Sequence, residues 1–150
     1  MPSFAFTVPG NGDFVRSPAL TWLRTLVLSA GSEFWCIGSG DGLLECSGAT
    51  LQLRFDEHYD FTLMYREASA EPGPCWIPFY PERAEEKEPI WVGGEPIIVS
   101  SRFFVPRKLA WDAVKHFCSN GERTRRINWV TSDEANWIFH WTAHPNVELQ

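Results

Sequence analysis

The sequence predicts a single α+β domain, residues 1–150, in which two helices pack on one curved antiparallel sheet. A length of 150 residues suits one compact core. Several short stretches alternate apolar and polar residues, as strands with one buried face do. Two other stretches, which begin near Ser17 and Pro106, repeat apolar residues at helical spacing and end at glycine.

The first half of the chain is expected to form one strand, one helix and four further strands. The segment Phe4 to Val8 alternates apolar residues. In SPALTWLRTLVLSAG, Ser17 suits an N-cap, Pro18 the first helical position and Gly31 the end of the helix. Strands follow in EFWCIG, GLLEC, ATLQLRF and YDFTLMYRE, separated by GSGDG, which is expected to be a hairpin turn, and by SG and DEHYD. The last two strands should pair as a half-buried hairpin through the acidic turn DEHYD.

The segment 68–89 differs from the rest because it is rich in proline and charge. Proline cannot donate to a sheet ladder, so this segment is expected to be a long exposed loop or an edge segment and not a central strand. It also carries large aromatic residues beside a run of glutamates. Such a composition fits a binding surface, and it equally fits a lid whose aromatic residues pack back onto the core.

The remaining chain is expected to add two strands, a helix and a last strand. PIWVGGEPIIVSSRFFV has strand-like composition with a turn at Gly93 and Gly94. Pro106 suits the first turn of a helix, and the segment 119–121 (SNG) suits its end. INWV then reads as a short apolar strand. The buried stripe of the helix is predicted to consist of Ala110, Ala113, Val114 and Phe117.

The net charge of −6 is concentrated in the middle of the chain. Between Glu33 and Glu95 there are thirteen acidic and four basic residues, a net charge of −9. Such a surface repels nucleic acid and anionic membranes, and it steers a basic protein partner toward itself. The alternative is a solvated surface that only keeps the protein soluble.

The cysteines and the apolar segments indicate a cytoplasmic protein. There is no apolar run of about eighteen residues, as a membrane span would need, and the first ten residues lack the features of a signal peptide. The four cysteines are widely spaced and form no C-x-x-C pair, so free buried thiols are expected. They are Cys36, Cys46, Cys75 and Cys118.

No catalytic, metal or cofactor motif is complete. GSGDG does not match the G-x-S-x-G nucleophile elbow, and a phosphate-binding loop is absent. The turn Asp56–Asp60 has oxygen and nitrogen ligands for a cation, yet four adjacent polar residues between strands are more typical of a solvated turn. The zinc-deaminase signature fails because Asp60 replaces the glutamate and Pro78 the second cysteine. His116, His140 and His144 are taken as incidental, and the protein is expected not to be an enzyme.

The closing segment VPRKLAWDAVKHFCSNGERTRRINWV, preceded by a strand and a GGEP turn, resembles immunity proteins of family one from bacterial polymorphic toxin systems. In that family a helix with an alanine-rich inner face ends near an aromatic residue, and a glycine turn and a tryptophan strand follow. The likeness covers about residues 17–130 and is sharpest over 103–130, whereas 131–150 has no counterpart. Thr124, where the family often has proline, and the insert before Trp91 depart from the pattern. The matching positions are Ala113, Phe117, Gly121, Ile127 and Trp129.

The resemblance implies a protein that binds a cognate toxin domain in a 1:1 complex and blocks it. Several family members accompany nucleic-acid deaminase toxins, so a cytosine deaminase is the first expectation. A nuclease or another toxin class is the alternative. An enzyme that reverses toxin damage also stays open, with the Asp56–Asp60 turn as its candidate site, and so does a self-assembling scaffold.

A toxin that acts on nucleic acid is basic around its cleft, so acidic residues of this chain are expected to contact it. Large aromatic residues are expected to anchor the complex, as they do in interface hot spots. The acidic set is Glu57, Asp60, Glu85, Glu86 and Glu88, and the aromatic set is Trp76, Phe79, Tyr80 and Trp91. No metal, cofactor, nucleic acid or membrane is expected to bind.

Overall fold

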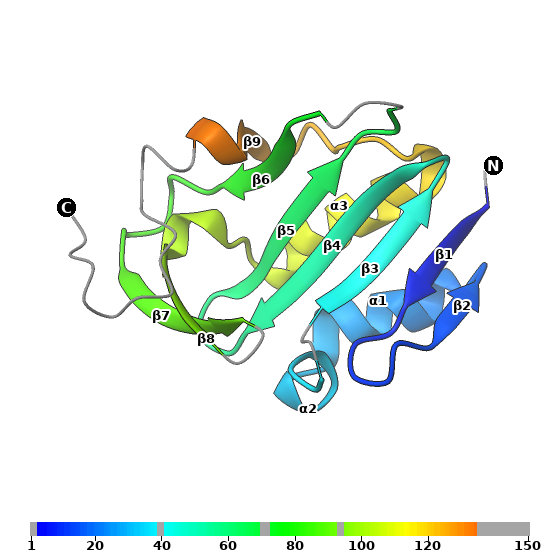
Figure 1. The fold of residues 1–150 in the computed structure, drawn as a ribbon, viewed down its shortest axis with the longest axis horizontal. Coiled ribbons are helices and arrows are strands. Elements are labelled where there is room, and N and C mark those ends of the chain that lie inside the picture. The colour runs from blue at the N-terminus through cyan, green and yellow to red at the C-terminus, as the bar shows by residue number, and fades with distance from the viewer. Residues whose placement is uncertain (1–2, 39–40, 70–72, 93–94, 135–150) are drawn as a thin grey trace.

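The computed structural model describes residues 3–38, 41–69, 73–92 and 95–134, with the backbone alone for 87–92 and 95–99. It confirms an α+β fold built on a curved antiparallel sheet (Figure 1). The seven strands lie in the order β2-β1-β3-β4-β5-β6-β9. Their bounds are β1 Phe4–Thr7, β2 Phe14–Arg16, β3 Asp41–Cys46, β4 Ala49–Asp56, β5 Asp60–Arg66, β6 Cys75–Phe79 and β9 Asn128–Thr131. A separate two-stranded hairpin consists of β7 Lys87–Val92 and β8 Glu95–Ser100.

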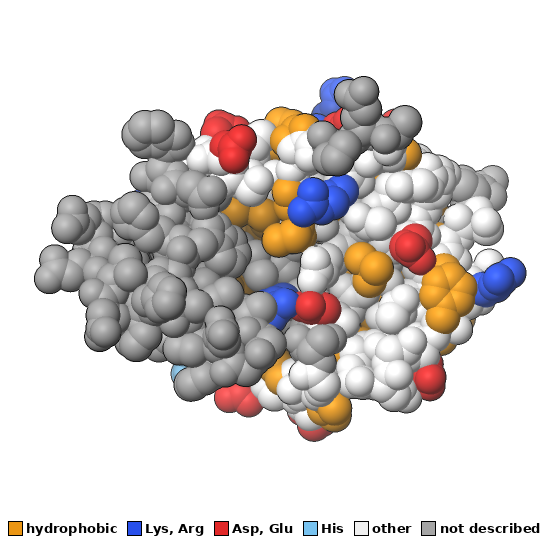
Figure 2. All heavy atoms as spheres, in the orientation of Figure 1, with side chains coloured by type: hydrophobic (Ala, Val, Ile, Leu, Met, Phe, Trp, Pro, Cys, Tyr) orange, Lys and Arg blue, Asp and Glu red, His pale blue; other side chains and the backbone are white. Residues whose placement is uncertain are grey.

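Two helices, α1 Leu20–Ser29 and α3 Arg107–Asn120, cover one face of the sheet (Figure 1). Two shorter helical segments, α2 Ser32–Trp35 and the 3₁₀ turn η1 Ser101–Phe103, connect the larger elements. The opposite face carries separated hydrophobic side chains with charged side chains between them (Figure 2). Helices on one face and a largely polar second face are what the alternating strands predict.

The main core lies between the sheet and the two helices. Every second residue of β4 and β5 is buried there, which follows from the two-residue period of a strand. The indole of Trp35, 1% exposed, packs edge-on against Phe6 and Phe61 and donates a 3.0 Å hydrogen bond to the Leu26 carbonyl. From α3 the core receives the predicted stripe of Ala110, Ala113, Val114 and Phe117.

A second, smaller apolar cluster lies on the other face of the sheet, at the β6 end. In the β5–β6 register Trp76 pairs with Tyr65, which faces α3, so its neighbours Cys75 and Ile77 point to the opposite face. There they pack with Phe103, the last residue of η1, and with Phe104, which follows it. The chain after β6 is therefore anchored to the sheet at η1 by burial of these apolar side chains.

The expected strand EFWCIG is wrong, because Ser32–Trp35 forms the short helix α2. The Glu33 carboxylate accepts a 3.0 Å hydrogen bond from the Gly31 amide at the helix start, and this bond lowers the pKa of Glu33. The helical turn brings Trp35 into the core. As a result GSGDG joins a helix to β3 and is not a hairpin turn; its residues 39–40 lie outside the described ones.

The first helix also begins later than expected. Ser17 has φ 46° and is exposed, and the helix starts at Leu20 with Ala19 in the cap position. Ser17 therefore caps nothing: its amide bonds to the Phe4 carbonyl at 2.8 Å, at the end of β2. The strand β2 itself was not expected from the sequence.

The proline-rich segment contains an interior strand, so the expectation of a loop or an edge segment is wrong for Cys75–Phe79. β6 lies between β5 and β9 and includes Pro78. Its ladder with β5 covers only Cys75 and Trp76, whereas its ladder with β9 continues through Phe79. Pro78 therefore pairs on one side only, which is why a residue without an amide proton is tolerated there.

The end of α3 confirms the predicted stop. Gly121 adopts φ 73°, the left-handed conformation that favours glycine at a helix C-terminus. A Cβ at this position would lie 2.9 Å from the Cys46 carbonyl oxygen. A substitution of Gly121 would therefore strain the backbone and press the helix end against β3.

All four cysteines are free, and three of them are buried; Cys36 is exposed. Burial, with a smaller contribution from the neighbouring Cys46, raises the pKa of Cys118 to about 12. The unfolded thiol titrates near pH 8.5, so above that value the unfolded chain binds fewer protons than the folded one.

Stability should therefore fall as the pH rises from about 8.5 toward 12, by roughly 1.4 kcal/mol per pH unit for this one thiol. Urea unfolding at several pH values measures the slope. In Cys118→Ala the number of protons released on unfolding should be smaller by one, so stability should depend less steeply on pH. An unchanged slope in that variant would show that this thiol does not titrate on unfolding.

Candidate partner-binding surface

The turn between β4 and β5 is acidic and tightly folded. The Asp56 carboxylate accepts hydrogen bonds from the amides of His58 (2.9 Å) and Tyr59 (3.1 Å), as an Asx turn does. Glu57 and His58 are exposed at its tip, while the Tyr59 ring is buried. The turn is therefore rigid at its base and presents its charged tip to solvent.

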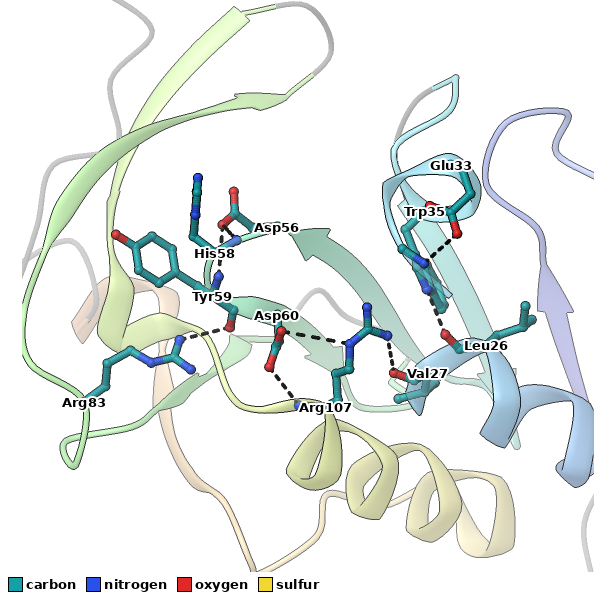
Figure 3. Close-up of polar contacts among 11 residues, drawn as sticks. Leu26, Val27, Glu33, Trp35, Asp56, His58, Tyr59, Asp60, Arg83 and Arg107 are labelled. Atoms are coloured by element: carbon teal, nitrogen blue, oxygen red, sulfur yellow. Dashed lines mark hydrogen bonds and ion pairs between the residues drawn. The ribbon is translucent and has the colours of Figure 1, made fainter. Parts of the chain in front are cut away.

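Asp60 links this turn to the start of α3 and has a structural role. Its carboxylate accepts a 3.2 Å hydrogen bond from the Arg107 amide and forms a 4.0 Å ion pair with the Arg107 side chain (Figure 3). The guanidinium also donates to the Val27 carbonyl at the end of α1 (2.9 Å) and lies over the Phe55 ring at 4.6 Å. Arg107 thus ties the turn, α1 and α3 together.

Replacing Arg107 with alanine should lower the free energy of unfolding by about 1–3 kcal/mol, because the Val27 carbonyl loses its side-chain donor and the Asp60 carboxylate loses its ion pair, keeping only the bond from the main-chain amide. Chemical denaturation measures the loss. Lys108→Ala, at an exposed position of the same helix turn, is the control and should change it by less than about 0.5 kcal/mol. Equal losses in both variants would contradict the role given to Arg107.

The acidic loop after β6 lies beside this turn, although the two are more than twenty residues apart in sequence. Arg83 donates a 2.9 Å hydrogen bond to the Tyr59 carbonyl (Figure 3). Its guanidinium also lies over the rings of Tyr59 and Tyr80. The Tyr59 hydroxyl in turn donates a 2.7 Å hydrogen bond to the Glu86 carboxylate. Two acidic segments are therefore fixed side by side.

Backbone and hydroxyl contacts to η1 hold the acidic loop in place. Ser101 accepts a bond from the Glu86 amide and donates one to the Ala84 carbonyl, both at 2.9 Å. Arg102 donates to the Arg83 carbonyl at 2.9 Å and pairs with Glu85 at 3.6 Å. The hairpin β7–β8 starts directly beyond this anchor.

We call the segments Asp56–Asp60 and Glu82–Glu86 together the acidic end. Arg83, and Arg102 of the neighbouring η1, donate to main-chain carbonyls, whereas the exposed acidic residues of the acidic end are Glu57, Glu82, Glu85 and Glu86. Charge and exposure thus combine at one end of the molecule. Such a surface offers carboxylates to the arginine and lysine side chains of a partner.

The aromatic residues expected as anchors are only half-buried or lie elsewhere. Phe79 packs against Phe103 in the smaller cluster, and Tyr80 follows it along the loop with its amide bonded to the Arg102 carbonyl (2.7 Å). Both are near the acidic end. Trp76 is not: it pairs with the far end of β5, and the Arg123 guanidinium lies over its ring at 3.9 Å.

Glu88 and Trp91 lie in β7, immediately after the acidic loop. Their side chains fall outside what the structure describes, so only their places in the β7–β8 register are known. Glu88 pairs with Val99, and Trp91 pairs with Pro96.

The structure adds residues that the sequence did not single out. Ile37 is 53% exposed and follows Cys36, whose Sγ lies 3.4 Å from the Phe55 carbonyl at the end of β4. A Cβ built on Gly10, in the turn after β1, would lie 3.0 Å from Ile37 Cγ2, so this exposed side chain lies beside the β1–β2 turn; the sequence did not reveal it because EFWCIG predicts a strand. Tyr59, Arg83 and Ser101 were also missed, because their roles depend on contacts between distant segments.

Among the described residues no group of three or more histidine, cysteine, aspartate or glutamate side chains is arranged to hold a metal ion. Within the same part of the chain no helix has the length and apolar character needed to cross a membrane. Comparisons with protein-family models, curated proteins and solved structures find no match.

Proposed function

We propose that this protein is a cytoplasmic immunity protein that binds a basic toxin domain through its acidic end and blocks it without catalysis. The observation that carries the proposal is the convergence of two acidic segments on a rigid support. Asp56–Asp60 and Glu82–Glu86 are held together by Tyr59, Arg83 and Ser101. Their exposed carboxylates therefore need little ordering when a partner binds.

The chemistry of a nucleic-acid-acting toxin fits this surface. Such a toxin must be positive around its cleft in order to hold phosphates. The carboxylates of the acidic end can pair with the same basic side chains in place of the phosphates. Charge complementarity of this kind raises the association rate and suppresses wrong partners. A deaminase or a nuclease toxin would be recognised alike, because both are basic at the cleft.

Apolar contacts beside the charges would supply the slow dissociation that immunity requires. The half-buried Tyr80 is a described residue available for this role, and Trp91 is the expected contribution from β7. Side chains of this kind at the centre of an interface contribute most of the binding free energy.

The proposal is tested in cells that express the toxin domain encoded beside this gene. Co-expression of the protein should restore growth, and an enzymatically inactive toxin should be pulled down with it in equal amounts. Restored growth without a stable complex would contradict blocking and would favour an enzyme that reverses toxin damage.

A further inference from the structure

A groove of about 770 Å³ lies at the end of the molecule opposite the acidic end. It is formed where β5 ends, at the C-terminus of α3 and at the start of β9. The strands β4 and β5 connect the groove to the acidic end. The eight residues of β4 separate the two by roughly 25 Å. Apolar side chains of Ala49, Ile127 and Trp129 and the Tyr65 ring line it together with polar groups.

The wall of the groove is rigid. The Tyr65 hydroxyl donates a 2.8 Å hydrogen bond to the Gly121 carbonyl, and the Trp129 indole donates a 2.9 Å bond to the Thr124 carbonyl. Both bonds fix the segment that follows α3. The groove is therefore formed before any ligand arrives, as binding sites for small groups usually are.

With respect to the described part of the chain, Arg123 in this wall has unused donor capacity. Its guanidinium stacks on Trp76 at 3.9 Å and lies over Tyr65 at 5.5 Å, so its plane is held in one orientation. Its one ion pair within the described chain, with Glu67, is 3.6 Å long, and none of its donors makes a hydrogen bond to a described residue. A stacked guanidinium with free donors is a ready partner for a planar carboxylate.

The other polar side chains that line the groove indicate which class of ligand it can bind. Arg125 and Asn128 are exposed on the same groove and offer further donors. Glu67 and Glu122 also line it, and their two carboxylates disfavour a doubly charged phosphate more than a single carboxylate. Because the apolar floor runs beside the donors, an acidic residue with an apolar neighbour fits better than a free anion.

We infer that this groove binds a carboxylate-bearing peptide segment of a partner protein, with Arg123 as the fork that receives the carboxylate. The apolar neighbour of that carboxylate packs on Trp129 and Ile127. This second recognition site does not rest on the proposed function, because it shares no residue with the acidic end and its ligand has the opposite charge.

The test follows the Trp129 indole signal by NMR during titration of the full chain with two blocked peptides, Ac-Leu-Asp-Leu-NH₂ and Ac-Leu-Asn-Leu-NH₂. The aspartate peptide should shift the signal saturably at concentrations up to about 10 mM, and the asparagine peptide should bind at least about tenfold more weakly. Absence of a saturable shift with the aspartate peptide overturns the inference. Equal binding of sodium acetate overturns the peptide class, because it would indicate a site for a free anion.

Variants test whether Arg123 is the residue that binds the peptide carboxylate. Arg123→Gln should weaken binding of the aspartate peptide at least about tenfold. Arg126→Gln removes the same charge beside the groove, where Arg126 pairs with Asp112, and should leave the binding unchanged. If Arg123→Gln fails to fold, Arg125→Gln provides the comparison and should weaken binding severalfold. Equal effects of the groove and control variants would mean that peptide binding depends on net charge alone, and this would contradict the role given to Arg123.

Discussion

Phe117→Ala is expected to lower the free energy of unfolding by about 3–5 kcal/mol, the loss typical of a large side chain removed from a packed core. Phe117 is 1% exposed, it lies on the inner face of α3, and its ring packs edge-on against Tyr65 of β5. Removing it leaves a cavity between helix and sheet. A loss of this size is a large share of the 5–15 kcal/mol that stabilises a typical domain, so poor expression at 37 °C should accompany it.

Urea denaturation measures the loss, with Lys115→Ala as the control from the exposed face of the same helix. The control should change the stability by less than about 0.5 kcal/mol. Trp129→Ala should cost less than Phe117→Ala, since Trp129 is only half-buried in β9. A stability of Phe117→Ala equal to that of the control would show that the core does not lie between α3 and the sheet.

Charge reversal at the acidic end is expected to have the largest effect on binding. In the triple variant Glu57→Lys, Glu82→Lys and Glu85→Lys, which leaves the Tyr59–Glu86 hydrogen bond in place, the association rate with a basic toxin domain should fall by roughly 10- to 1,000-fold at low salt, the range over which electrostatic steering acts. The difference from the wild type should narrow as the ionic strength rises, because the Debye length shortens to about 8 Å at physiological salt. Stopped-flow fluorescence at several salt concentrations measures both effects.

A matched control variant distinguishes an effect of where the charges lie from an effect of the net charge of the protein. Glu45→Lys, Glu67→Lys and Glu122→Lys change the net charge by the same amount, but these exposed residues lie away from the acidic end. This triple variant should bind with nearly the wild-type rate. Equal slowing of both triple variants would mean that net charge alone governs association, and the acidic end would lose its role.

Local pattern was enough to predict much of the fold. The alternation in β4 and β5 and the helical stripe of α3 each repeat over several residues, so burial and secondary structure agree along the whole element. Gly121 could be predicted as a helix stop because the left-handed conformation there favours glycine.

The errors arose where tertiary contacts outweigh local preference. EFWCIG looks like a strand because Phe34, Trp35 and Ile37 are aromatic or β-branched, yet Trp35 reaches the core through a helical turn. Pro78 argued against an interior strand, but a ladder that ends early on one side removes the conflict. Neither fact is visible within a short window of sequence.

The candidate site was predicted only in its composition. The sequence identified two acidic segments, and their proximity depends on Tyr59, Arg83 and Ser101, which join residues 15 to 27 positions apart. The same reasoning could not separate Trp76 from the other aromatic residues, because its place at the far end of β5 follows from strand register.

The measurement that tests the central proposal most directly is titration calorimetry of the purified protein against the toxin domain encoded beside its gene, with toxin activity followed in the same samples. We expect tight 1:1 binding, complete loss of toxin activity at equimolar protein, and weaker binding at high salt. Folded protein that shows no heat of binding and leaves the toxin active would contradict the immunity function.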